Sequence, residues 1–242
     1  MVLQSEAKVI FSIRQLIEAW AVHAYTSVGL VLGFTALWAA ANEYAGLFIL
    51  YLTLAAIVDA TDGTLARWFK VKERLPDFDG RKLDDITDYL NYVFIPVFAC
   101  YHFNLVHGNW TWVLAFVLVA AAYGFSHQAA KTEDGFFTGF PNYWNVVALY
   151  LLLLGMPVWA NAVILLVLAV LVFVPLRYLS TRTRQFGSWT VGLGLIWGAM
   201  IVAILLQWPS PNKWLVWLSL FYPAYYLAMS FFLSIRCRRV NT

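Results

Sequence analysis

The chain has 242 residues, of which 62% are hydrophobic and 12% are charged, and its formal net charge is +3. Its mean hydropathy is +0.70. A water-soluble domain could not cover so much apolar surface with polar groups, so the composition excludes a soluble globular protein and predicts a polytopic membrane protein. The small net charge argues against a nucleic-acid partner and suits contact with anionic lipid headgroups.

The first residues differ from the rest of the chain in their pattern. Between Val2 and Trp20, apolar residues recur at roughly helical spacing, with Lys8 and Arg14 among the polar residues between them. Such a pattern predicts an amphipathic helix that lies at the membrane interface, which we place at residues 1–18. Residues 19–235 are predicted to form the transmembrane bundle, so that the whole chain is one membrane domain.

Long apolar segments follow this first helix, and most of them are long enough to cross a hydrocarbon core of about 30 Å. Turn-forming Gly, Pro and Asn residues separate most of them. The sequence therefore predicts an all-α fold with about eight transmembrane helices. The predicted spans are residues 19–41, 45–67, 84–106, 110–129, 143–157, 159–179, 189–207 and 213–234.

The basic residues predict how this bundle is oriented. An even number of spans places both termini on the same side of the membrane. Of the 16 Lys and Arg residues, only Lys213 falls on the other side. By the positive-inside rule, both termini and the loops on their side are predicted to face the cytoplasm.

Four aspartates stand at the cytoplasmic ends of the second and third predicted spans. Asp59 and Asp62 are three residues apart, and Asp84 and Asp88 are four apart, so each pair shares one face of its helix. A short basic loop joins the two helices, which predicts that they lie side by side with the carboxylates in one pocket. Carboxylates this close stay ionised only with cations between them. Oxygen ligands select magnesium, manganese or calcium, and the four acids suffice for two ions.

Small residues and an arginine accompany the acids. Gly63 and Ala66 leave a trough along the helix, where a phosphorylated group can approach the backbone. Arg67 can donate two hydrogen bonds to a phosphate. The combination predicts a diphosphate site, and its place at the membrane face favours a lipid-linked nucleotide diphosphate as the substrate. The alternative, structural ion bridges to the loop's Lys and Arg, does not need small residues at these positions.

These residues resemble the signature of the CDP-alcohol phosphotransferases. The stretch from Asp59 reads Asp-Ala-Thr-Asp-Gly-Thr-Leu-Ala-Arg, and Gly80, Asp84 and Asp88 follow. Twelve residues separate Arg67 from Gly80, which is longer than the usual spacing in the family. That gap resembles the bacterial phosphatidylcholine synthase branch, as do the Ala-Trp-Ala-Val-His start of the first span and the Asp-Gly-Phe-Phe-Thr-Gly-Phe-Pro loop at residues 134–141.

The resemblance implies a metal-dependent transfer reaction. Asp59, Asp62, Asp84 and Asp88 would bind Mn²⁺ or Mg²⁺, and Asp88 would also be the general base. The phosphatidyl group of CDP-diacylglycerol would pass to choline, and CMP would leave. The resemblance also implies a multi-pass protein of the bacterial inner membrane, with the active site facing the cytoplasm, that forms a homodimer.

The resemblance further implies which residues hold the CDP group. Gly63, Ala66 and Gly80 match positions that make room for the cytidine and its ribose. Arg67 would lie near the phosphates, and Asp62 would complete the CDP site.

A choline site is predicted from the chemistry of its quaternary ammonium, which aromatic faces and a nearby carboxylate hold. The cytoplasmic loop between the fourth and fifth spans offers Glu133, Asp134, Tyr143 and Trp144. The alternative is that these aromatic residues belong to the Trp and Tyr belt that marks every membrane interface.

A second basic group, Arg177, Arg182 and Arg184, is a candidate for contact with a substrate phosphate or a lipid headgroup. The positive-inside rule alone would also place these residues on the cytoplasmic side.

Two other functions compete with this interpretation. The signature concerns the CDP end, so another acceptor, such as serine in a phosphatidylserine synthase, inositol or glycerol phosphate, stays open. From a different class, a divalent-cation transporter could use the same acids. A transport path needs polar groups through the depth of the membrane, whereas here they gather at one face.

Overall fold

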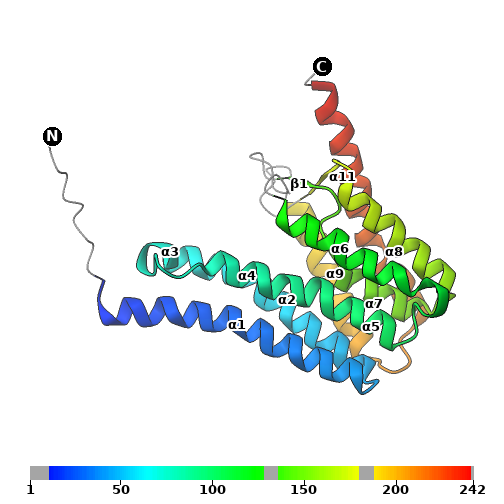
Figure 1. The fold of residues 1–242 in the computed structure, drawn as a ribbon, viewed down its shortest axis with the longest axis horizontal. Coiled ribbons are helices and arrows are strands. Elements are labelled where there is room, and N and C mark those ends of the chain that lie inside the picture. The colour runs from blue at the N-terminus through cyan, green and yellow to red at the C-terminus, as the bar shows by residue number, and fades with distance from the viewer. Residues whose placement is uncertain (1–10, 128–135, 180–187, 241–242) are drawn as a thin grey trace.

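A computed structural model describes residues 11–127, 136–179 and 188–240, and these ranges are almost entirely helical (Figure 1). Two long helices begin the fold: α1 (Ile13–Ala41) and α2 (Ala45–Trp68). The chain reverses between them at Glu43, whose φ of 62° is left-handed. The two helices run antiparallel and pack along each other, which places the end of α2 beside the beginning of α1.

The first helix begins at Ile13, after a capping box at Ser12. Ser12 Oγ accepts a hydrogen bond from the backbone N–H of Gln15 at 3.3 Å, and Gln15 Oε1 accepts one from the N–H of Ser12 at 2.9 Å. The sequence predicts an interfacial amphipathic helix over residues 1–18. Residues 13–18 are helical and continue into α1 without a break, because no Gly or Pro interrupts them. Their place at the membrane interface stays a prediction. Residues 1–10 lie outside the described residues.

The third predicted span is a helix with a widened middle. The loop before it contains a short helix, α3 (Val71–Arg74). The span itself consists of α4 (Gly80–Asp88), the π-helical η1 (Tyr89–Phe94) and α5 (Ile95–His102). Asp79 caps α4, since its Oδ1 accepts a hydrogen bond from the N–H of Lys82 at 3.1 Å. Pro96 accounts for η1, because proline has no N–H to donate to the carbonyl of Tyr92 four residues earlier.

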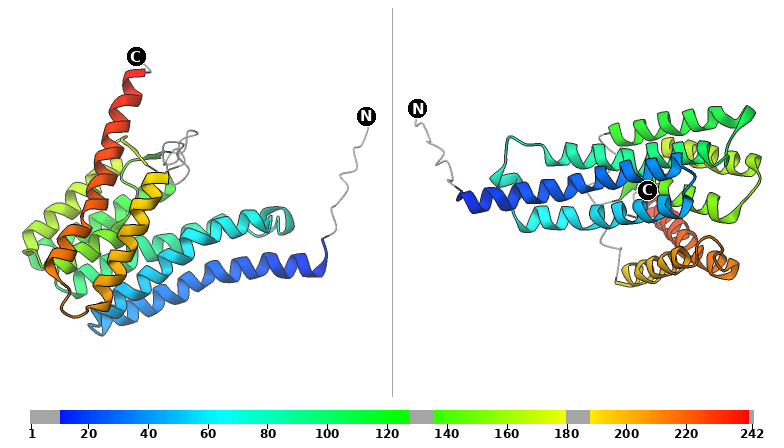
Figure 2. Two further views of the ribbon diagram at one scale, coloured as in Figure 1. Left: turned by 180° about the vertical axis from the view of Figure 1, so that it is seen from behind. Right: turned by 90° about the horizontal axis from the view of Figure 1, so that it is seen from below.

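The remaining elements are η2 (Gly108–Trp110), α6 (Thr111–Ser126), β1 (Phe137–Thr138), α7 (Trp144–Leu154), α8 (Val158–Phe173), β2 (Arg177–Tyr178), α9 (Ser188–Leu206), α10 (Lys213–Ser219) and α11 (Phe221–Val240). Figure 2 shows α6 and the pair of α9 and α11 on opposite sides of the group formed by α1, α2 and α4. α4, which carries Asp84 and Asp88, packs against α1 and continues into η1, which contacts α2, α6 and α7.

One short β-ladder departs from the predicted all-α fold. β1 and β2 pair antiparallel, with Phe137 opposite Tyr178 and Thr138 opposite Arg177. Gly139 follows β1 with a φ of 82°, and a side chain there would collide with the carbonyl of Val172. The ladder ties the segment before α7 to the end of α8, a long-range contact that no local sequence pattern announces.

All eight predicted spans are helical over most of their described length. Within the described residues, five helical segments are long and apolar enough to cross a membrane, so the chain is an all-α polytopic membrane protein apart from the ladder. α7 and α8 are apolar but shorter, and the third span is divided among α4, η1 and α5. The number of eight crossings stays a prediction. The five long segments are Ile13–Ala41, Ala45–Trp68, Gly108–Ser126, Trp189–Leu206 and Lys213–Ile235.

Large apolar side chains cover the outside of the molecule as well as its core. Leu206 and Trp214 are 82% and 83% exposed, and many other aliphatic and aromatic residues are exposed on α1, α8, α9 and α11. Inside, one apolar cluster joins η1, α5, α6, α7 and α8, and a second joins α1, α2, α5 and α9. An exterior this apolar is stable only in contact with lipid.

Candidate active site

Three of the four predicted metal-binding aspartates meet between α2 and α4. One carboxylate oxygen from each of Asp59, Asp84 and Asp88 lies within 4.8 Å of the other two, and all three residues are half-buried. Asp84 and Asp88 are one turn apart on α4, and Asp59 faces them from α2. α1 packs against both α2 and α4, and the three carboxylates meet, as the sequence predicts. We refer to them as the three-aspartate cluster.

The three-aspartate cluster fits a divalent metal ion. Asp88 Oδ1 is buried and has no hydrogen-bond partner among the described residues. A buried carboxylate oxygen without a partner is costly, and like charges at this distance repel each other. The donors are oxygens only, which suits magnesium or manganese better than zinc or copper.

Asp62, the fourth predicted ligand, lies outside the three-aspartate cluster. Its side chain is only 6% exposed. Thr26 of α1 and the backbone of Gly63 lie close enough to interact with its carboxylate. Asp62 therefore has partners in the protein, and its role as a metal ligand stays a prediction.

Tyr92 is a site residue that the sequence analysis misses. Its hydroxyl donates a hydrogen bond of 2.7 Å to Asp59 Oδ2. Tyr92 follows Asp88 by four residues, a spacing that places both on one side of a helix and that could have signalled the contact. In a chain with 13 Tyr and 12 Trp, a single tyrosine does not stand out from the interfacial aromatic residues. Its bond fixes the orientation of the Asp59 carboxylate.

The two small residues predicted to line a trough beside Asp62 differ in their exposure. Gly63 is exposed, and a side chain there would meet only the guanidinium of Arg67, at 3.5 Å. Arg67 is also exposed and donates a hydrogen bond to the Thr64 hydroxyl at 2.9 Å. Ala66 is half-buried and packs against an apolar cluster of α1 and α3 residues. Gly63 and Arg67 are thus accessible to a phosphate, and the role of Ala66 in the CDP site stays a prediction.

Gly80 makes room for a side chain of the protein. A Cβ on Gly80 would collide with the imidazole of His23, which comes from α1 and is 7% exposed. The His23 ring also lies 4.4 Å from the ring of Phe78, centroid to centroid, and 5.9 Å from that of Trp20. The predicted role of Gly80 in the CDP site stays a prediction, and the structure adds a second reason for a glycine there.

The four candidates for the choline site have different surroundings. Glu133 and Asp134 lie outside the described residues. Trp144 is 1% exposed, and its indole N–H donates to Asn142 Oδ1 at 3.1 Å, so it is part of the core. Tyr143 is half-buried, and its ring lies 6.4 Å from that of Tyr92.

The three arginines predicted to contact a phosphate or a lipid headgroup differ in what the structure describes. Arg177 lies on β2, and its guanidinium is 5.9 Å from the ring centre of Phe136. Its backbone N–H donates to the Ser234 hydroxyl at 3.2 Å. Arg182 and Arg184 lie outside the described residues. A phosphate contact by any of the three stays a prediction.

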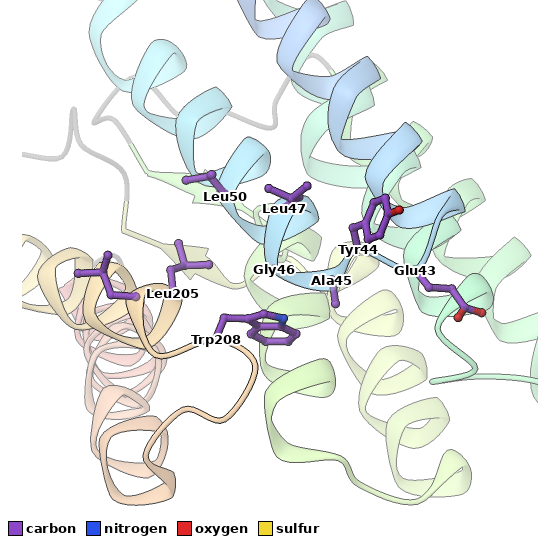
Figure 3. A pocket seen from close by; sticks show the side chains of 9 residues that line it. Glu43, Tyr44, Ala45, Gly46, Leu47, Leu50, Leu205 and Trp208 are labelled. Carbon is purple, nitrogen blue, oxygen red and sulfur yellow. The ribbon is translucent and has the colours of Figure 1, made fainter.

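An apolar groove lies at the other end of α2. It has a volume of about 460 Å³, and Tyr44, Leu50, Leu205 and Trp208 are among its lining residues (Figure 3). Leu50 precedes Asp59 by nine residues, which is about 14 Å along a helix. The groove is therefore separate from the three-aspartate cluster.

Comparison with known proteins decides the family. A family model described as CDP-alcohol phosphatidyltransferase matches residues 22–176. The chain belongs to this family. The matched range holds all eight signature residues and the three-aspartate cluster that they build.

The chain is also similar to several bacterial phosphatidylcholine synthases. The chain is 36% identical to a phosphatidylcholine synthase of Pseudomonas aeruginosa, over 90% of this chain and 93% of the relative. It is 34% identical to one of Legionella pneumophila, over 92% and 91% of the two chains. A third, from Rhizobium meliloti, is 32% identical over 83% of this chain and 84% of its own.

Proposed function

We propose that this chain transfers the phosphatidyl group of CDP-diacylglycerol to choline and releases CMP. The observation that carries the proposal is the meeting of Asp59, Asp84 and Asp88 in a chain that matches a phosphatidylcholine synthase over 90% of its length. The shared name of the relatives supports choline as the acceptor. The accessible pair of Gly63 and Arg67 beside the cluster supports a diphosphate as the donor.

Asp88 is the base in this reaction. Its buried Oδ1 accepts no hydrogen bond from the described residues, so it is available for the proton of the choline hydroxyl. The choline oxygen forms a bond to the phosphorus that carries the diacylglycerol. The bond between that phosphorus and the CMP oxygen breaks, and CMP leaves with the electron pair. Tyr92 holds the Asp59 carboxylate in place beside the base.

Asp59, Asp84 and Asp88 would hold the divalent ion, and Asp62 would contribute to a second one. Such an ion, Mn²⁺ or Mg²⁺, supplies stabilisation of the negative charge that grows on the phosphate oxygens. The carboxylates alone would repel the diphosphate of the substrate. We also propose that the site faces the cytoplasm from the bacterial inner membrane, which the family resemblance and the basic loops support. The family resemblance further supports a homodimer.

CMP release from CDP-diacylglycerol by the purified protein tests the proposal. We expect release that requires both choline and Mn²⁺ or Mg²⁺, and that stops with excess EDTA and returns when the metal is added back. Serine, inositol and glycerol phosphate are assayed in parallel. Release with serine but not with choline would assign the chain to another acceptor. Metal uptake into proteoliposomes without any CMP release would contradict the assignment as an enzyme and favour a divalent-cation transporter.

A further inference from the structure

Tyrosines from three separate elements gather beside the three-aspartate cluster. Tyr92 comes from η1, Tyr143 from the turn before α7, and Tyr226 from α11. The ring centres of Tyr92 and Tyr143 are 6.4 Å apart, and those of Tyr143 and Tyr226 are 5.8 Å apart. Their planes meet at 56° and 69°, so the rings form adjoining walls instead of a flat stack. We call these three residues the tyrosine wall.

The tyrosine wall is joined directly to the reacting end of the site. The hydroxyl of Tyr92 donates to Asp59 Oδ2 at 2.7 Å. Tyr143 lies close enough to interact electrostatically with both Asp59 and Asp88. A small molecule whose oxygen meets Asp88 would therefore have its other end near these rings.

The rings are held in place by contacts at their hydroxyl ends or in the surrounding core. Tyr226 is 9% exposed, and its hydroxyl donates to the carbonyl of Leu179 at 2.7 Å. Tyr92 and Tyr143 are half-buried. Trp144 points elsewhere, since its indole is enclosed in the core and bonded to Asn142.

The surroundings of the tyrosine wall are suited to a cation. No described Lys or Arg forms an ion pair with Asp59 or Asp88; both ion pairs found among the described residues involve Glu18. Tyrosine faces attract a cation within about 6 Å of the ring centre, and the neighbouring carboxylates add to that attraction. A quaternary ammonium has no N–H to donate, so ring faces are the contacts that it can use.

Resting on the proposed function, we infer that the tyrosine wall binds the trimethylammonium group of the acceptor while the acceptor hydroxyl meets Asp88. Two carbons separate the hydroxyl of choline from its nitrogen, so both ends are held within one compact site. Tyr143 is the central residue, because its ring contacts both of the others.

The test compares Tyr143→Leu with Tyr143→Phe, and uses Tyr89→Leu as the matched control. Tyr89 on η1 is half-buried, as Tyr143 is, but its hydroxyl donates to the carbonyl of Leu118 and its ring contacts Phe125. We expect Tyr143→Leu to raise the KM for choline about tenfold or more, with the KM for CDP-diacylglycerol within about twofold of the parent. Tyr143→Phe keeps the ring and is expected to stay within about threefold for both substrates.

Tetramethylammonium supplies a second measurement, because it offers the cation without the hydroxyl. It should inhibit the parent protein competitively with choline, and its inhibition constant should rise in Tyr143→Leu by the same factor as the KM for choline. Equal rises in both KM values, a Tyr143→Phe defect as large as that of Tyr143→Leu, or no competition by tetramethylammonium would overturn the inference. If the parent protein releases no CMP with choline, the proposed function itself has failed.

Discussion

Asp88 combines two properties that suit the proposed base, a place in the three-aspartate cluster and an oxygen without a hydrogen-bond partner among the described residues. Asp85, one residue away from Asp84 on the same short helix, is half-buried too but points about 100° away from it. At the scale of the residue, function therefore depends on which face of α4 a carboxylate occupies.

Asp88→Asn is expected to lower kcat by about 10²-fold or more, because the amide cannot accept the proton of the choline hydroxyl. The fold is expected to persist, since Asn has nearly the same shape, and the variant should still bind CDP-diacylglycerol. Asp85→Asn serves as the control and should stay close to the parent. Turnover of Asp88→Asn within tenfold of the parent would remove Asp88 from the role of base.

Gly80→Ala is expected to impair the protein, because the new methyl group collides with the His23 ring. The double variant Gly80→Ala with His23→Ala removes the ring and should restore thermal stability toward that of His23→Ala alone. The measurement is a double-mutant cycle of unfolding temperature together with the KM for CDP-diacylglycerol. Recovered stability without a recovered KM would show that Gly80 also makes room for the nucleotide; no recovery of stability would contradict the steric explanation.

Two elements set the geometry of the site, the π-helical η1 and the short helix α3. η1 lets Tyr92 reach Asp59 while Asn91, the residue before it, donates a hydrogen bond of 3.0 Å to the carbonyl of Gly29 on α1. α3 is tied to α1 by Arg74, whose guanidinium bonds to Glu18 Oε2 at 3.0 Å and to the carbonyl of Gln15 at 3.2 Å. Both contacts join segments that are far apart in the sequence.

Arg74→Ala is expected to loosen the loop between α2 and α4 and to destabilise the protein by about 1 kcal/mol, because the guanidinium's contacts with Glu18 and the Gln15 carbonyl are lost. The Arg74 side chain is 13% exposed. Arg14→Ala is the matched control, because Arg14 also pairs with Glu18 but its side chain is 89% exposed. Hydrogen exchange of residues 69–79 should rise in Arg74→Ala and not in Arg14→Ala. Unchanged exchange in both would show that the pair does not hold the loop.

At the scale of the whole molecule, the positive-inside rule places the loop between α2 and α4 in the cytoplasm and the loop before α6 outside. Asp77→Cys and Asn109→Cys, each in a background with Cys237→Ser, put single thiols at exposed positions of these two loops, while Cys100 is buried. A membrane-impermeant thiol reagent added to intact spheroplasts should label Asn109→Cys alone, and it should label both after lysis. Labelling of Asp77→Cys in intact spheroplasts would reverse the predicted orientation.

The sequence by itself determined the features that depend on composition and helical periodicity. Apolar segments long enough for lipid predicted a helical membrane protein, and spacings of three and four placed the aspartates of each helix on one face. The tertiary structure decided which carboxylates meet, because the depth and rotation at which two helices pack depend on contacts between distant residues. For this reason Asp62 lies apart from the three-aspartate cluster, His23 fills the space beside Gly80, and Tyr92 and Tyr226 join Tyr143 near Asp59.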